Sequence, residues 1–332
     1  MKIPSAPRLL ALTLFSLSAY ATAPHAQETT LHLINEYPAT SITAGTDLQF
    51  AATVEKLSNG GIKIATLQES ANPYKGKEQV AAVSTDKAEM GTLFAGILGG
   101  SDPFFLLSSL PFVVGSFEQA QALFACAQPE LENHVSKLNA RLLYVTPWPP
   151  SGIWSAQPVS DIASVKALRI RTYDDNSRGV FERLGAQSAN LPFSAVGPKL
   201  VSGELNAVLS SGDGGAGNKL WEYLPNFTAV NYAIPLSYTI INTDAWNRLS
   251  QNQQTLLTQA AAITNERTWN TVKDRIEANY ARMRDNNMTL NLAPSDGVRN
   301  ALRQAGDAQT ISWWKQNNAT AISAQCLNKT GS

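Results

Sequence analysis

Residues 210–217, "SSGDGGAG", carry the spacing of a nucleotide-binding turn. From Gly212 the stretch reads G-x-G-x-x-G, in which glycines let the main chain approach an anion and the next helix offers its N-terminus. It follows a strand-like run, "LNAVLSS", and precedes "NKLWEYL", which predicts a helix. The acidic residue expected at the end of the next strand is replaced by Asn231 or Asn242. A single glycine fingerprint is not specific, so we expect no nucleotide, and no other cofactor is indicated.

The other residues of the sequence give little indication of an enzyme. The sequence shows no G-x-S-x-G or H-E-x-x-H motif, and no S-x-x-K with suitable partners. His32 and His134 lie far apart in the chain, which predicts neither a metal site nor a histidine triad. Two carboxylates in one cleft can act as general acid and base, so an enzyme of that kind stays open as an alternative. The carboxylates that suit such a pair are Glu36, Glu69, Asp174 and Asp213.

Charge and the N-terminal segment limit the possible partners. The 26 basic and 26 acidic residues cancel without forming a basic run, so we expect no nucleic acid partner. Lys2 and Arg8 precede the apolar run "LLALTLFSLSAYATA", which is the layout of a secretory signal peptide. We expect cleavage near Gln27, which removes residues 1–26, although residues 19–21 also suit the peptidase. The run is short for a membrane-spanning helix, so no membrane insertion is expected after cleavage.

Export also changes how the two cysteines are interpreted. Cys126 and Cys326 are the only cysteines, and an oxidising compartment favours a disulfide between them over two unrelated thiols. Such a bridge would hold the C-terminal tail against the N-terminal domain.

Hydrophobic periodicity predicts two α/β domains. Strand-like "TLHLINEY", "IKIATL" and "EMGTLFAGIL" alternate with helical stretches, and the alternation returns from "ALRIRTYD" to "LNAVLSS", so parallel strands are expected in both domains. Pro235 interrupts the apolar run at 227–242, which places a hinge near it. A helix from Ser250 to about Asn287 is long enough to lie across both domains. We assign residues 27–150 and about 236–276 to the first domain, and residues 151–235 and about 277–332 to the second.

The carboxyl ends of the first domain's strands are candidate ligand contacts, because parallel sheets bind ligands at that edge. Polar side chains there would pair with polar groups of a ligand and reject analogues that leave them unpaired. The residues selected on this basis are Asn35, Glu36, Tyr37, Glu69, Thr92 and Phe94.

The order of motifs resembles the periplasmic solute-binding subunits of TRAP transporters, the DctP type, from about Leu31 to Trp314. The family's G-x-K-I-R strand corresponds to "KALRIRTYDDN", and its L-G-A-x-P-x-x-x-P-F-S-E-V-Y stretch corresponds to "RLGAQSANLPFSAVGPKL". The segments "LPF" at 110–112 and "INTDAWNRLSQNQQTLLTQAA" also match. The resemblance implies a two-domain, Venus-flytrap fold with mixed sheets, a ligand enclosed between the domains, and no catalysis. It also implies a bacterial periplasmic location and delivery to the small and large subunits of a sodium-coupled permease.

The resemblance places a carboxylate-binding arginine at Arg171. A guanidinium makes two parallel hydrogen bonds to a carboxylate and stays charged at any relevant pH, whereas a surface salt bridge is the alternative role. The family has an apolar wall at the position of Phe193 and a carboxylate-binding asparagine at the position of Ser210. Ser211 and the N–H groups that follow are further donors.

Three further positions correspond to the family's cleft. Tyr173 follows the arginine strand where the family usually has a proline. Asp213 lies in the glycine turn, where it would accept a hydrogen bond from the ligand or face solvent. Tyr232 falls in the segment at 231–232 that lines the cleft of the family.

One departure from the family bears on the ligand. Trp154 stands where many members carry a second arginine, so a second ligand carboxylate would lack a partner. With Trp148 nearby, the expected cleft is rich in aromatic surface, and we predict a monocarboxylate with an apolar or aromatic body, such as an aryl or 2-oxo acid. A sugar acid or C4-dicarboxylate is the alternative, and the tryptophans could instead pack the hinge.

Overall fold

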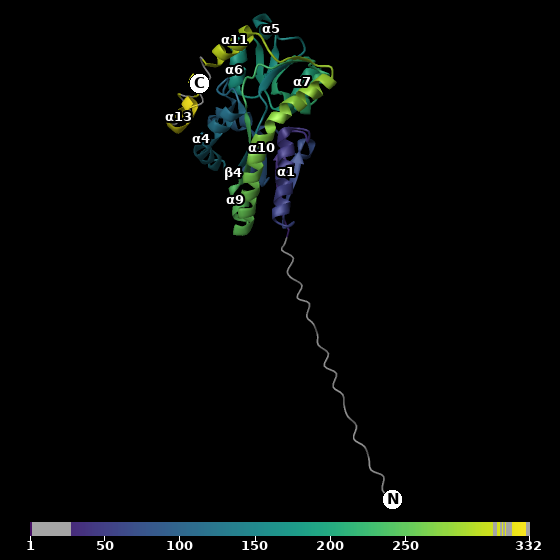
Figure 1. Ribbon diagram of the computed structural model, residues 1–332, viewed down its shortest axis with the longest axis vertical. Helices are drawn as coiled ribbons and strands as arrows, with labels where there is room; N and C mark the ends of the chain where they lie inside the picture. The colour runs from purple at the N-terminus through teal and green to yellow at the C-terminus, as the bar shows by residue number, and fades with distance from the viewer. Residues whose placement is uncertain (2–27, 308–310, 313, 315, 317–320, 330–332) are drawn as a thin grey trace.

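The computed structural model describes residue 1, residues 28–307, residues 311, 312, 314 and 316, and residues 321–329. Two sheets, each surrounded by helices, organise these residues into two domains (Figure 1). The predicted signal peptide lies, apart from Met1, outside the described residues. In the part of the chain that the structure describes, no helix combines the length and the apolar character needed to cross a membrane.

The first domain is built on a five-stranded mixed sheet with the order β2-β1-β3-β10-β4. Its strands are β1 (Thr29–Asn35), β2 (Ile62–Gln68), β3 (Met90–Phe94), β4 (Ala140–Pro147) and β10 (Leu236–Asn242). β1 is parallel to β2 and β3, whereas β10 is antiparallel to β3 and β4. The helical elements are α1 (Ile42–Leu57), α2 (Lys77–Ser84), α3 (Ala95–Gly99), α4 (Phe117–Ser136) and α9 (Thr243–Asn247), with 3₁₀ turns η1 (Glu69–Ala71) and η2 (Pro103–Ser109).

The second domain is built on a six-stranded mixed sheet with the order β11-β9-β5-β8-β6-β7. Its strands are β5 (Ser151–Ser155), β6 (Arg169–Thr172), β7 (Gln187–Asn190), β8 (Ala207–Ser211), β9 (Asn226–Thr228) and β11 (Thr289–Asn291). β6 is parallel to β7 and β8, and β5 is antiparallel to β8 and β9. The helical elements are α5 (Ile162–Lys166), α6 (Asp175–Arg183), α7 (Val196–Val201), α8 (Gly212–Gly217) and α11 (Asp296–Gly306), with 3₁₀ turns η3 (Phe193–Ala195) and η4 (Leu220–Glu222). The predicted two-domain α/β fold with mixed sheets is confirmed.

Two of the segments at which the chain crosses between the domains lie side by side. β9 pairs in the second sheet and β10 in the first, so the chain passes over at 229–235, where Pro235 predicted a hinge. This crossing lies beside the one that follows β4, because the Trp148 N–H donates to the Pro235 carbonyl (2.9 Å) and the Ser151 N–H to the Ala233 carbonyl (2.9 Å). A proline suits this place since no sheet ladder requires its missing N–H.

Helix α10 (Gln251–Asp285) spans both domains, as its predicted length suggested. It begins with a capping box, in which the side chains of Ser250 and Gln253 each accept a hydrogen bond from the other's backbone N–H. It packs against α1 and β4 in the first domain and against α8 and β11 in the second, and Figure 1 shows it as a green helix beside both. Its buried residues include Trp269, Val272 and Met283, which helical spacing places along the inner side of the helix.

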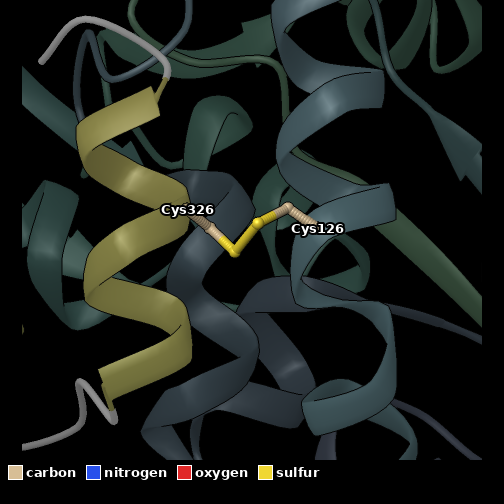
Figure 2. Close-up of a disulfide and its surroundings, with 2 residues drawn as sticks. All are labelled: Cys126 and Cys326. Atoms are coloured by element: carbon tan, nitrogen blue, oxygen red, sulfur yellow. A yellow bond between two sulfur atoms is a disulfide. The ribbon is translucent and has the colours of Figure 1, made fainter.

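A disulfide attaches the C-terminal tail to the first domain. It joins Cys126 of α4 to Cys326 of α13 (Ala321–Lys329), as Figure 2 shows, and so confirms the predicted pairing. The Trp314 indole adds a second attachment, because its Nε1–H donates to the Pro103 carbonyl (3.0 Å). The tail therefore packs on the first domain, and the residue limits of the two domains stay a prediction.

Candidate ligand-binding site

A small pocket lies between the two domains, at the carboxyl ends of β1, β3, β6 and β8. The space not occupied by protein atoms measures about 280 Å³. The predicted residues that line it are Tyr37, Phe94, Trp148, Arg171, Tyr173, Phe193, Ser210 and Ser211. Ser151, Gly214 and Pro235 also line the pocket and were not predicted. Ser151 and Pro235 belong to the two crossings. The prolines at 149, 150 and 235 were the signal that could have identified them.

Arg171 supplies the only charged side chain among the described residues that line the pocket. Its side chain is only 3% exposed, and its guanidinium donates to the Leu191 carbonyl (2.8 Å) and lies 5.0 Å from the centre of the Phe193 ring. Within the described part of the chain, no ion pair of 4.0 Å or less joins this guanidinium to a carboxylate. Burial lowers the pKa of Arg171, yet an arginine remains protonated under all ordinary conditions. The pocket therefore contains a buried positive charge without a protein counter-charge in contact.

Glu36 and Asp174 are acidic groups that act electrostatically on this arginine, and neither lines the pocket. Glu36 is the stronger of the two. Its carboxylate accepts hydrogen bonds from the Gly76 N–H (3.0 Å) and the Gln79 amide (3.2 Å) of the first domain. Burial raises the pKa of Glu36, while the Gly76 N–H and the charge of Arg171 act in the opposite direction. Glu36 thus supports the loop that begins α2 instead of offering an acceptor to a ligand.

Aromatic rings from both domains form the apolar walls of the pocket. The Tyr37 ring lies 4.7 Å from the Trp148 ring and 6.0 Å from the Phe193 ring, measured between centroids. Phe94 meets Tyr173 edge-on at 5.3 Å, so the two domains are in contact here. The Trp148 indole N–H donates a hydrogen bond to the Ser237 hydroxyl (3.0 Å). This bond satisfies the only polar atom of the Trp148 side chain, so the rest of the ring forms part of the apolar wall.

Hydroxyl groups lie on the side of the pocket that belongs to the second domain. The Ser211 hydroxyl accepts the Gly214 N–H (3.0 Å) and caps α8, so it can still donate to a ligand. The Tyr173 hydroxyl lies 3.4 Å from the Ser151 hydroxyl. Ser151, Ser210 and Ser211 thus offer hydroxyl donors in the same pocket as the arginine.

The glycine-rich stretch is a short helix, which corrects the predicted turn. α8 covers Gly212–Gly217, and a 3₁₀ turn replaces most of the helix predicted at 218–224. Packing requires glycine in this helix, because a Cβ on Gly215 would lie 2.1 Å from the Trp154 ring. Trp154 itself is fully buried beneath α8 and donates to the Ser211 carbonyl (3.2 Å), so it supports the pocket floor and does not line the pocket.

Asn35 and Thr92 belong to a buried network behind the pocket. Both donate to Asp47 (2.7 Å each), and the Tyr144 hydroxyl donates to the same carboxylate (2.8 Å). Burial raises the pKa of Asp47 to about 6, although these three hydrogen bonds lower it. The side-chain Oδ1 of Asn35 in turn accepts the Tyr37 N–H (2.9 Å), so Asn35 positions a residue that lines the pocket but does not line it itself.

The remaining predicted contacts lie elsewhere. Glu69 is exposed, has a left-handed backbone (φ 48°) and does not line the pocket. Tyr232 is fully buried and lies 6.5 Å from the Tyr173 ring, one layer behind the lining. Asp213 is fully buried between α8, α1 and α10 and neither meets the pocket nor faces solvent.

Gly96 marks a close approach of the two domains beside the pocket. A Cβ on Gly96 would lie 2.3 Å from the backbone carbonyl of Tyr173, which cannot move away as a flexible side chain can. Gly96→Ala is therefore expected to hold the domains apart at this point and to weaken ligand binding about tenfold or more in calorimetric titration. Gly179→Ala is the matched control, because a Cβ there meets no atom within 4 Å. Unchanged affinity in Gly96→Ala would show that the ligand-bound state lacks this contact.

No cluster suited to a metal ion occurs in the described residues, where no three His, Cys, Asp or Glu side chains converge. Three of the four carboxylates considered for an acid–base pair, Glu36, Asp174 and Asp213, accept structural hydrogen bonds. Asp174, for example, accepts the Ser177 N–H (2.7 Å) and caps α6.

A family model described as bacterial extracellular solute-binding protein, family 7 (DctP), matches residues 35–317. The chain belongs to this family. Two solved Bordetella pertussis structures, DctP6 and DctP7, are described as extracytoplasmic solute receptors binding pyroglutamic acid, and each is 25% identical to this chain. DctP6 has a TM-score of 0.84, and the match covers 91% of this chain and 99% of the DctP6 chain. DctP7 has a TM-score of 0.85, and the match covers 92% of this chain and 100% of the DctP7 chain. The sugar acid binding protein DctPAm of Advenella mimigardefordensis, solved with galactonate, has a TM-score of 0.85 over 92% of this chain and 98% of its own at 17% identity, which shows the shared fold.

This membership confirms the predicted TRAP-type solute-binding family. The protein is an extracytoplasmic solute receptor, and the pocket between its domains is the natural candidate for the solute site. Its related structures are receptors and not enzymes.

Proposed function

We propose that this receptor captures a small monocarboxylate with a compact, largely apolar body in the pocket between its domains. It acts in the bacterial periplasm and passes the solute to the small and large subunits of a sodium-coupled TRAP permease. No turnover of the ligand is part of this function.

The buried, unpaired Arg171 is the observation that carries the proposal. A cation removed from water is costly unless an anion accompanies it, and a carboxylate fits the guanidinium fork with two parallel hydrogen bonds. The Ser210 and Ser211 hydroxyls lie at the same end of β8 and can donate to the same anion. An anionic ligand therefore supplies the counter-charge that the pocket lacks.

The rest of the lining supports a ligand with one carboxylate and a small body. The space is narrow, because rings of the two domains already meet beside it, with 5.3 Å between the centroids of Phe94 and Tyr173. No second cation lines it among the described residues, so a second carboxylate would be buried without a partner. The aromatic walls suit a flat or cyclic body, and pyroglutamic acid, which DctP6 and DctP7 bind, is such a monocarboxylate.

A thermal-shift panel tests the proposal, because a ligand raises the apparent stability of the protein that binds it. The panel contains pyroglutamate, 2-oxo acids, aryl carboxylates, galactonate and succinate. Proline is a matched control for pyroglutamate, since its ammonium would find no carboxylate among the described lining residues. We expect stabilisation by a monocarboxylate and none by proline or succinate.

Mass spectrometry of material released from denatured protein identifies a co-purified ligand directly. A clear preference for galactonate or succinate would contradict the apolar monocarboxylate, and chemical conversion of the bound ligand would indicate an enzyme.

A further inference from the structure

Asp213 is a fully buried carboxylate that contacts three elements from both sides of the domain boundary. It lies on α8 of the second domain, and its Oδ1 accepts the N–H of Ile42 (2.7 Å), the first residue of α1 in the first domain. Its Oδ2 accepts hydrogen bonds from Arg275 and from the Asn279 amide (2.9 Å), both on α10. One side chain thus joins the second domain, the first domain and the helix that spans them.

The same partners tie the neighbouring main chain together. Arg275 also donates to the Thr40 carbonyl of the first domain, so its guanidinium bridges Thr40 and Asp213. The Thr40 hydroxyl donates to the carbonyl of Gly217 at the end of α8 (3.3 Å). A Cβ on Gly217 would lie 3.7 Å from both Pro38 and Thr40, which shows how closely α8 approaches this loop.

Both sides of this contact continue directly into the ligand pocket. On the second domain, Ser211 and Gly214 line the pocket, and Asp213 lies between them in the chain. On the first domain, Tyr37 lines the pocket and precedes the loop at 38–41 that meets α8. A change in distance between the domains therefore acts on the Asp213 contacts and on the pocket walls together.

We propose that Asp213 is a latch that favours the closed arrangement of the two domains and thereby strengthens ligand binding. The proposal rests on the proposed solute-binding function. Opening at α1 exchanges the contacts of Asp213 with the first domain for hydrogen bonds to water, and the net free energy of these charge-assisted contacts favours the closed arrangement. Closure restores them, and the energy gained is available to hold the ligand.

Distances between the domains test the latch without knowledge of the ligand. Leu48 of α1 and Val201 of α7 are 47% and 70% exposed, so spin labels on Leu48→Cys and Val201→Cys report the separation of the domains. Both native cysteines are held in the disulfide and do not compete for label. We expect Asp213→Asn to shift the ligand-free distance distribution toward longer separations.

Affinity provides the second measurement, with a ligand from the panel. Asp213→Asn should raise the Kd about tenfold, mainly through faster dissociation, because one charge-assisted contact is lost from the closed state. Asp86→Asn is the matched control, since the Asp86–Arg248 ion pair (2.5 Å) lies within the first domain and should change neither measurement. If Asp213→Asn does not fold by circular dichroism, Arg275→Gln removes the other side of the ion pair and should give the same shift.

The outcomes separate the latch from the proposed function. An unchanged ligand-free distance distribution in the folded variant overturns the latch, whether or not the affinity changes. If no panel member binds the native protein, the proposed ligand class fails, and the ligand-free distances still decide the latch.

Discussion

Arg171→Ala is expected to abolish ligand binding while the protein remains folded. The guanidinium is the charged group that the pocket offers, and its loss removes two charge-assisted hydrogen bonds to the ligand carboxylate. Charge-assisted bonds of this kind correspond to at least about a hundredfold loss of affinity. Isothermal titration with the panel's best ligand measures the loss, and circular dichroism measures the fold.

Two variants make this result specific. Arg169→Ala removes an exposed arginine two residues earlier in β6, where the side chain only donates to the Gly203 and Glu204 carbonyls, so affinity should not change. Arg171→Lys keeps a positive charge without the planar fork and should fall between the native protein and Arg171→Ala. Binding within about twofold of native in Arg171→Ala would place the carboxylate anchor elsewhere.

Removal of the disulfide is expected to cause the largest loss of stability. Cys126 and Cys326 are 200 residues apart, and closing a loop of that length stabilises a protein by up to about 5 kcal/mol in the chain-entropy model. The Cys126→Ser, Cys326→Ser double variant should therefore unfold on the order of 10 °C lower in a calorimetric scan. Its affinity for the ligand should change far less, because neither cysteine lines the pocket.

Reduction provides an independent form of the same experiment. A reductant should lower the unfolding temperature of the native protein toward that of the double serine variant and leave the variant unchanged. Equal unfolding temperatures for native and double-serine proteins would mean that the remaining contacts of α4 and α13 are sufficient to hold the tail.

The sequence by itself determined the fold class and the chemical centre of the site. Alternating strand and helix periods predicted two α/β domains because each period follows from burying one face of a local element. Pro235 indicated the crossing because a proline disfavours a central ladder whatever surrounds it. Arg171, on the strand that resembles the family's arginine strand, is the predicted anchor, and the structure places it in the pocket. The predicted export signal and the presence of two cysteines sufficed to predict the disulfide.

Only the tertiary structure decided which neighbours of that centre reach the ligand space. Trp154, Thr92 and Asp213 lie at strand ends or in the glycine stretch, as a ligand contact would, yet each is taken up by partners distant in sequence. Asp213 accepts hydrogen bonds from Ile42 and Arg275. Trp154 lies under α8, a helix rich in glycine, although glycine has a low intrinsic helix propensity. The local sequence pattern indicates which side chains point into the protein. Whether such a side chain contacts the ligand, the core or the other domain depends on packing between segments that are distant in sequence and meet only in the folded chain.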